Sequence, residues 1–255
     1  MKSLDLAIEF NNVNLTYNNN FTVLEGISFK IPHPCCCLLL GQTGSGKSTV
    51  LSIIKGVIPY INRQSLTGSI NILSNPLEES TFYEITKQIG FLTQEPEILT
   101  LESTIEYDIA FTLENLGYNT SQIKENLASL EKKYPLIKKY LNQSPNKLSA
   151  GEITLFQLII SNLANPDLIL YDEPLSVLDQ IQKLSFIKTI KELVRKKTIV
   201  ISTHELELLL PIADYIIVLD KSSKSITFEG YKEKFLDEMK KFPWLDIPIE
   251  YSIEV

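Results

Sequence analysis

One run of small and polar residues has the types and spacing needed to hold phosphate. Residues 41–49 read G-Q-T-G-S-G-K-S-T and fit the pattern G-x-x-x-x-G-K-[ST]. Glycines let backbone N–H groups approach phosphate oxygens, and a helix beginning here adds the positive charge of its N-terminus. The lysine of this pattern reaches the β- and γ-phosphates, and the next hydroxyl ligates Mg²⁺. We predict a nucleotide site with magnesium at Gly41, Gln42, Thr43, Gly44, Ser45, Gly46, Lys47, Ser48 and Thr49.

Two adjacent acids end an apolar segment further along the chain. Residues 168–171 read L-I-L-Y, and Asp172 and Glu173 follow directly. Carboxylates at the carboxyl edge of a parallel sheet lie where ligands of such sheets bind. We predict that Asp172 belongs to the Mg²⁺ shell and that Glu173 polarises an attacking water. Two acids at a solvated strand end are the simpler alternative.

A third segment, L-S-A-G-E at residues 148–152, begins a predicted helix. Ser149 and Glu152 have the S-x-x-E spacing of a capping box, in which each side chain bonds the other residue's backbone N–H. A good helix N-cap is therefore enough to explain both residues locally.

The cysteines and one of the histidines are predicted to have no chemical role. The three cysteines are consecutive, at Cys35–Cys37, and successive strand residues point to opposite faces, so the three cannot converge on one metal. We interpret them as small apolar residues of a buried strand. His33 lies between two prolines in a predicted turn.

The elements that position these residues follow from the hydrophobic pattern. Alternation over the first thirty residues predicts antiparallel strands joined by the Asn-rich turn at 18–20. The pattern is helical between about 100 and 163, and strands alternate with helices on both sides of this insert, which predicts a parallel α/β core with a helical subdomain. The remaining predicted strands are 35–40, 67–74, 89–93, 168–171, 198–202, 215–219 and 226–228, and the helices are 47–57, 180–194 and 205–213.

Composition narrows the possible functions. The chain has 255 residues and a net charge of −7, with 44% hydrophobic and 22% charged residues, which is ordinary for a folded domain. The acidic balance argues against a nucleic-acid-binding surface. No apolar run approaches the roughly 18 residues of a membrane span. The first ten residues lack the apolar core of a signal peptide, so we expect a cytoplasmic protein.

The order of motifs along the chain resembles that of the ATP-binding cassette (ABC) ATPases. This resemblance implies an α/β fold of the P-loop NTPase (RecA-like) type, in which a parallel-sheet core carries an antiparallel β subdomain and a helical subdomain. It also implies one domain over residues 1–255, with a short C-terminal tail at 230–255. The motifs are, in order, Tyr17, the phosphate loop, Gln94, L-S-A-G-E, Asp172 with Glu173, the segment 176–179, and His204.

The resemblance also implies roles within one subunit. Tyr17 looks like the aromatic on which adenine stacks, although an aromatic of the strand core is an alternative. Gln94 resembles the glutamine that touches Mg²⁺ or water and senses the transmembrane partner. His204 would contact the γ-phosphate and help to position Glu173 as the base.

Other roles depend on a second ATPase subunit. Ser149 and Gly151 resemble the signature residues that contact the γ-phosphate held by the opposite subunit, and Asp179 would lie across the dimer interface. The usual signature is L-S-G-G-Q, whereas this chain has Ala150 and Glu152, and Leu155 replaces a common arginine. We interpret these departures as a weakened signature that serves a pair with a non-identical partner.

One further segment suggests the branch of the family. Residues 104–117 read T-I-E-Y-D-I-A-F-T-L-E-N-L-G and are similar to T-V-E-E-D-V-A-F-G-P-E-N-L-G of the ATPases of energy-coupling-factor (ECF) transporters. An amphipathic helix with Ile105, Ile109 and Leu113 on its apolar face explains the same segment. In this branch, the groove between Gln94 and this helix receives coupling helices of a membrane scaffold.

The resemblance therefore implies an ATPase that powers solute uptake. Its expected partners are a second ABC ATPase, like or unlike itself, an integral-membrane scaffold and a substrate-binding membrane component, with no nucleic acid. Its expected location is the inner face of the cell membrane, held by those partners. A soluble cassette ATPase and a weakly hydrolysing nucleotide switch are the alternatives, and the short tail leaves permanent dimerisation open.

Overall fold

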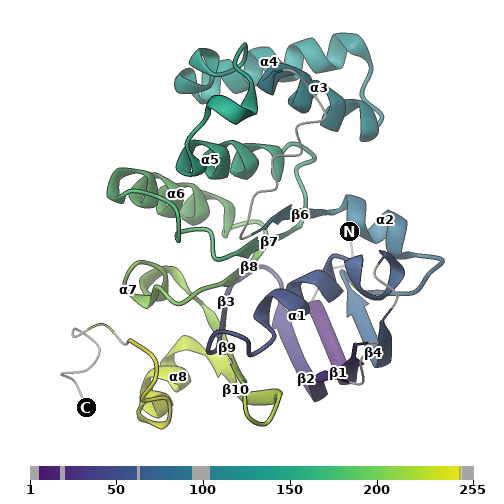
Figure 1. The fold of residues 1–255 in the computed structure, drawn as a ribbon, viewed down its shortest axis with the longest axis vertical. Coiled ribbons are helices and arrows are strands. Elements are labelled where there is room, and N and C mark those ends of the chain that lie inside the picture. The colour runs from purple at the N-terminus through teal and green to yellow at the C-terminus, as the bar shows by residue number, and fades with distance from the viewer. Residues whose placement is uncertain (1–5, 18–20, 62–63, 94–103, 247, 249–255) are drawn as a thin grey trace.

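The computed structural model describes residues 6–17, 21–61, 64–93, 104–246 and 248. Its centre is a six-stranded sheet in the order β10-β9-β3-β8-β7-β6, parallel except for the edge strand β10. Helices lie on both sides of this sheet (Figure 1), which is why its inner strands are continuous apolar runs. The strands are β3 (Cys36–Leu40), β6 (Ile89–Leu92), β7 (Leu168–Asp172), β8 (Thr198–Ser202), β9 (Tyr215–Asp220) and β10 (Ser225–Tyr231).

A second, antiparallel sheet has the order β2-β1-β4-β5. Its strands are β1 (Leu6–Thr16), β2 (Thr22–Pro32), β4 (Ser65–Ile72) and β5 (Asn75–Pro76). The predicted alternation is confirmed, because Phe10 of β1 pairs with Phe29 of β2 and both are buried. The predicted strand 67–74 was displaced by two residues: β4 ends at Ile72, and Leu73 and Ser74 have positive φ values in a turn.

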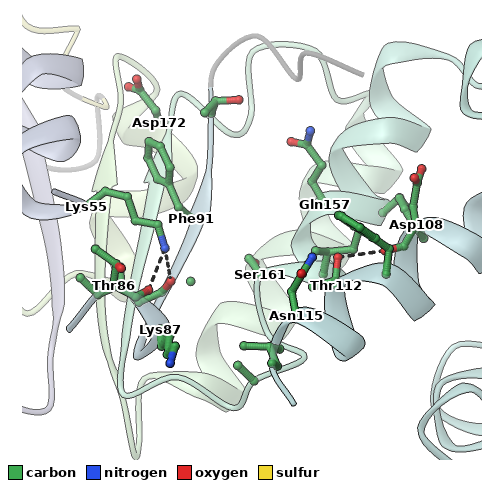
Figure 2. A pocket seen from close by; sticks show the side chains of 18 of the residues that line it. Lys55, Thr86, Lys87, Phe91, Asp108, Thr112, Asn115, Gln157, Ser161 and Asp172 are labelled. Carbon is green, nitrogen blue, oxygen red and sulfur yellow. Dashed lines mark hydrogen bonds between the residues drawn. The ribbon is translucent and has the colours of Figure 1, made fainter. Parts of the chain in front are cut away.

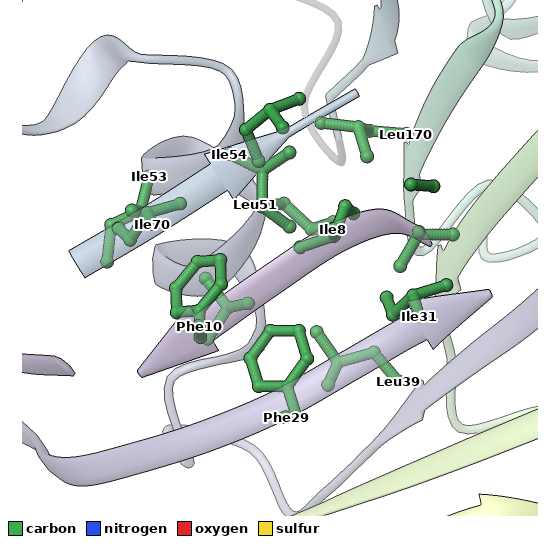
Figure 3. Packing of buried hydrophobic residues seen from close by; sticks show 14 of the residues in the cluster. Ile8, Phe10, Phe29, Ile31, Leu39, Leu51, Ile53, Ile54, Ile70 and Leu170 are labelled. Carbon is green, nitrogen blue, oxygen red and sulfur yellow. The ribbon is translucent and has the colours of Figure 1, made fainter. Parts of the chain in front are cut away.

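Helix α1 (Lys47–Ile54) packs between the two sheets. Its apolar residues Leu51, Ile53 and Ile54 meet Phe10 and residues of β2 in one core (Figure 3). The predicted helix end at 57 was wrong, because Gly56 adopts a φ of +76° and terminates the helix early. Helix α2 (Phe82–Lys87), which hydrophobic periodicity did not predict, follows a kinked segment over Val57–Ile61 and strands β4 and β5.

The segment at 104–163 is helical and forms a core of its own. It contains α3 (Ile105–Asn115), α4 (Thr120–Lys133), α5 (Ala150–Ile160) and two 3₁₀ turns at Pro135–Lys139 and Pro145–Lys147. Ile105, Ile109 and Leu113 are buried in this core, which confirms the amphipathic reading of α3. The group of helices lies beyond the β6 end of the sheet (Figure 1).

The remaining helices cover the other face of the central sheet. They are α6 (Gln180–Leu193), α7 (Leu206–Leu209) and α8 (Lys232–Glu238), with 3₁₀ turns at Leu210–Ile212 and Met239–Lys241. The predicted helix 205–213 is thus a four-residue helix followed by a 3₁₀ turn. Phe228, Phe235 and Phe242 form an aromatic cluster that packs the C-terminal segment against this core.

The cysteines lie where the sequence predicted. Cys35 precedes β3, Cys36 and Cys37 belong to it, and all three are free and buried. Burial raises the pKa of the Cys35 thiol to about 12 and raises those of its neighbours further, so the reactive thiolate form is suppressed. Among the described helices, none has both the length and the apolarity to span a membrane.

Candidate nucleotide site

The phosphate loop connects the buried strand β3 to the start of α1. Gly44 and Gly46 have φ values of +80° and +104°, which L side chains rarely adopt. A Cβ at Gly41 would approach the Leu219 carbonyl oxygen within 2.6 Å, so this position has no space for a side chain. Among the described residues, no side chain caps α1, and its first N–H groups are therefore available to an anion.

Lys47 lies at the centre of a polar cluster. Its Nζ donates to the Gly41 carbonyl at 2.8 Å and lies 3.0 Å from His204 Nε2 and 3.6 Å from Glu173 Oε1. Burial lowers the pKa of the Lys47 ammonium, and the carboxylates of Glu173 and Asp172 oppose that shift. The cluster thus brings together the predicted lysine, base and histidine from three separate segments.

Glu173 is held in an unusual backbone conformation, with a φ of +47°. Its N–H donates to Ser202 Oγ at 3.1 Å, and its Oε2 accepts from the His204 N–H at 3.2 Å. Its Oε1 is buried without a hydrogen-bond partner among the described residues, although His204 Nε2 lies 3.2 Å away. Glu173 Oε1 therefore makes ion-pair contacts with Lys47 and His204 and accepts no hydrogen bond from the described residues.

Ser202 is a site residue that sequence reasoning did not identify. Its hydroxyl donates to Asp172 Oδ1 and accepts from the Glu173 N–H, so one buried side chain orients both acids. The available indication was its position: it is the first hydroxyl after three apolar residues, at the end of the strand that leads to His204.

Two predicted site residues, Tyr17 and Gln94, are not among the contacts of the Lys47 cluster described above. Tyr17 follows β1 half-buried at the edge of the core, and its hydroxyl lies 3.5 Å from Thr49 Oγ1 beyond the phosphate loop. This places it near the loop and is compatible with both readings of the residue. Gln94 lies outside the described residues.

Ser149, Gly151 and Asp179 form a second group, at the N-termini of α5 and α6. Ser149 and Asp179 are the exposed N-cap residues of these helices, and each begins a capping box. Gly151 is buried against α6, where a Cβ would come within 2.5 Å of Gln182 Oε1. Within the described part of the chain, no hydrogen bond or ion pair joins this group to the Lys47 cluster.

Comparison with known proteins agrees with this geometry. The family described as ABC transporter matches residues 24–176, which span the phosphate loop, the helical subdomain and both acids. The chain belongs to the ABC transporter family. The predicted ABC ATPase fold is confirmed, and so is the prediction of an ATP-binding subunit.

Two relatives are ATP-binding proteins of energy-coupling factor transporters. EcfA1 of Mycoplasma mobile is 32% identical over a stretch that covers 83% of this chain and 76% of EcfA1. EcfA of Carboxydothermus hydrogenoformans is 30% identical over a stretch that covers 85% of this chain and 78% of EcfA. CbiO1 from Clostridium perfringens, part of the ABC transporter complex CbiONQ, has the same fold, with a TM-score of 0.78 at 20% identity over 98% of this chain and 99% of its own. The chain spans 41% and 40% of the length of two relatives from Bacillus cereus and Methanosarcina mazei.

The segment at residues 148–152 makes one contact that the sequence did not predict. As predicted, Glu152 points back at the start of α5, where its Oε2 accepts from the Ser149 N–H at 2.8 Å and from Ser149 Oγ at 2.9 Å. Its Oε1 accepts from the Tyr140 hydroxyl at 2.6 Å. Sequence reasoning missed Tyr140, which lies in the preceding loop and has no local pattern that marks it.

A cavity of about 910 Å³ separates the nucleotide core from the helical subdomain. Figure 2 shows Lys55, Thr86 and Phe91 on its core side and Asp108, Thr112 and Gln157 on its helical side. The Lys55 Nζ donates to the carbonyls of Thr86 at 3.0 Å and Ile89 at 2.7 Å, and burial lowers the pKa of Lys55 to about 8.

Proposed function

We propose that this chain binds and hydrolyses Mg·ATP at the Lys47 cluster. The observation that carries the proposal is the convergence of Lys47, Glu173 and His204 beside an uncapped helix start. The phosphates of ATP would accept hydrogen bonds from the loop N–H groups and would compete with Glu173 for the Lys47 ammonium. Their negative charge would stabilise the charged form of Lys47, which burial alone disfavours.

Glu173 Oε1, which accepts no hydrogen bond from the described residues, has lone pairs for the role of a general base once ATP draws Lys47 toward its phosphates. A water placed between this oxygen and the γ-phosphate would give its proton to Glu173 while its oxygen bonds to phosphorus, and the bond from phosphorus to the β–γ bridging oxygen would break to release ADP. The His204 N–H fixes the other carboxylate oxygen, so Glu173 is oriented before the substrate binds. The His204 imidazole, whose Nε2 lies 3.0 Å from the Lys47 ammonium, would donate to the γ-phosphate after ATP displaces that contact.

The residues beside the loop fit a magnesium ion. The Asp172 carboxylate is 5% exposed at the end of β7, and Ser48 is exposed in the first turn of α1, so both supply the hard oxygen ligands that Mg²⁺ prefers. Bound there, Mg²⁺ would neutralise charge on the phosphates. We also propose Gln94 as a third ligand of this Mg²⁺.

We further propose that two ATP-binding subunits dimerise head to tail and power solute uptake of the ECF type. The exposed N-cap residues Ser149 of α5 and Asp179 of α6, with Gly151 buried beside them, support the dimer, since each helix start would meet nucleotide on the opposite subunit. The identities with two EcfA proteins and the segment 104–117 support the ECF branch. The cavity beside α3 would receive helices of a membrane scaffold, which would hold the chain at the cytoplasmic face of the membrane.

Replacing Glu173 by Gln tests the catalytic assignment, because the amide keeps the shape but cannot accept the proton. We expect ATP turnover to fall by at least 100-fold while binding of a fluorescent ATP analogue stays within a few-fold of wild type. Unchanged turnover would remove Glu173 from the base role. Co-purification with an ECF membrane scaffold in a shared expression host tests the transport role, and its absence would count against the ECF branch.

A further inference from the structure

The turn between β9 and β10 places a lysine against the phosphate loop. A Cβ at Gly44 would lie 3.5 Å from Lys221 Nζ and 3.6 Å from Lys221 Cε. One carbon–carbon bond adds about 1.5 Å, so the Lys221 ammonium lies within about 5 Å of the Gly44 Cα. An exposed cation is therefore present at the loop that would hold the phosphates of a nucleotide.

The order of strands explains why this lysine is here. Strand β3, which leads into the phosphate loop, lies between β8 and β9 in the central sheet (Figure 1). Since the three strands are parallel, their carboxyl ends meet at one edge of the sheet. His204 comes after β8 and Lys221 directly follows β9, so the two residues approach the loop from opposite sides.

The turn that carries Lys221 is held in place at both ends. Asp220, the last residue of β9, accepts the Ser223 N–H at 2.7 Å through its Oδ2. The Lys224 carbonyl accepts the Glu25 N–H of β2 at 2.9 Å, and Lys224 Nζ lies 3.5 Å from Glu25 Oε1. The backbone of the turn is thus fixed to β2, while the exposed side chain of Lys221 can still move toward a ligand.

The Lys221 ammonium has no counter-charge of its own. Within the described part of the chain it takes part in no ion pair or hydrogen bond, whereas Lys47 lies 3.6 Å from Glu173 Oε1 and Lys224 pairs with Glu25. The start of α1 adds a partial positive charge at the same loop. Because positive charges gathered at one place repel each other, a bound polyanion would relieve this repulsion.

We propose that Lys221 is a phosphate-binding residue of the nucleotide site, a second cation that contacts the polyphosphate from the side opposite His204. The inference rests on the proposed binding of Mg·ATP at the Lys47 cluster, and it adds a residue that lies outside the phosphate-loop motif. A lysine has a long, flexible stem and an ammonium with three donors, so it can reach a phosphate oxygen from an exposed turn. Lys221 should therefore act on the phosphates of the nucleotide and not on its base.

Replacing Lys221 by Met in the full chain removes the charge and keeps a long side chain. The Kd for a fluorescent ATP analogue with Mg²⁺ should rise by about 5–20-fold, and Lys221→Arg should restore binding. Inorganic tripolyphosphate has neither base nor ribose, and its inhibition constant against the analogue should rise by a similar factor in Lys221→Met. Lys124→Met, on the exposed surface of α4, removes the same charge far from the loop (Figure 1) and should change neither value.

Each other result would overturn the proposal. If Lys221→Met binds the analogue as tightly as wild type, or if its loss equals that of Lys124→Met, the lysine does not contact phosphate. If binding of the analogue weakens and binding of tripolyphosphate does not, Lys221 acts on the nucleoside instead. If the wild-type chain binds neither probe, the proposed function itself fails and this inference fails with it. Thermal melting checks the fold of each variant, and Lys221→Gln repeats the test if Lys221→Met does not fold.

Discussion

Replacing Ser202 by Ala removes the one side chain that orients both acids of the nucleotide site. Ser202 is fully buried, and its hydroxyl donates to Asp172 Oδ1 and accepts from the Glu173 N–H at 3.1 Å. The substitution leaves an ionised acceptor and a backbone donor without this partner. The volume change is small, so lost hydrogen bonding should dominate over any cavity.

The expected loss of stability follows from these two contacts. A buried hydrogen bond to a charged group contributes about 1.5–3 kcal/mol, and a neutral one about 0.5–1.5 kcal/mol. The Glu173 N–H keeps the Ser202 carbonyl at 3.1 Å as a second acceptor. Losing its hydrogen bond to the Ser202 hydroxyl should therefore cost an amount near the low end of the range for a neutral hydrogen bond. We expect the free energy of unfolding to fall by about 2–4 kcal/mol.

Urea unfolding followed by circular dichroism measures this loss, compared at equal m-value. Ser161→Ala is the matched control, because Ser161 is also buried but donates to a backbone carbonyl of its own helical turn, Leu158, at 2.9 Å. We expect about 1 kcal/mol for the control. The magnesium concentration for half-maximal ATP turnover should also rise about 10–100-fold in Ser202→Ala. Equal destabilisation of the two variants, with unchanged magnesium dependence, would refute the reasoning.

Two further predictions concern groups outside the loop. Lys183 Nζ donates to Glu205 Oε2 at 2.5 Å and so connects the start of α6 to the residue after His204. Lys183→Met should lower kcat several-fold with little change in KM, and Lys183→Arg should restore kcat. A fall in both kcat and KM would contradict a positioning role. The pKa of Lys55 is lowered to about 8, so between pH 8 and its ordinary value of 10.5 the unfolded chain binds more protons than the folded one, and the free energy of unfolding should rise with pH in this window. Urea midpoints at pH 7.5 and 10 should show this rise in wild type and not in Lys55→Met, and an equal pH dependence in both would contradict it.

The sequence by itself predicted which residues could do chemistry and on which elements they lie. Three features depend on spacings of only a few residues: the phosphate loop, the two acids after an apolar strand, and the capping box. Local backbone geometry determines which side chains and N–H groups such spacings bring together. Hydrophobic period likewise predicted the two kinds of sheet and the helical insert, since burial imposes a period of 2 or 3.6 on the residues that make each element. The errors fell at element ends, such as Gly56 after α1, and at the short helix α2, which the hydrophobic pattern did not indicate.

Only the tertiary structure decided which distant residues meet. The contacts of Lys47 with Glu173 and His204 join three strand ends, and their distances follow from the order of strands in the sheet, which periodicity does not specify. Ser202 and Tyr140 have no distinctive local pattern and acquire their roles by touching Asp172 and Glu152 in space. The capping box at Ser149 could be predicted from four residues of sequence. The hydrogen bond from the Tyr140 hydroxyl to the Glu152 carboxylate could not, because Tyr140 comes from another segment. Contacts between residues far apart in the chain depend on packing of whole elements, and no short stretch of sequence encodes that.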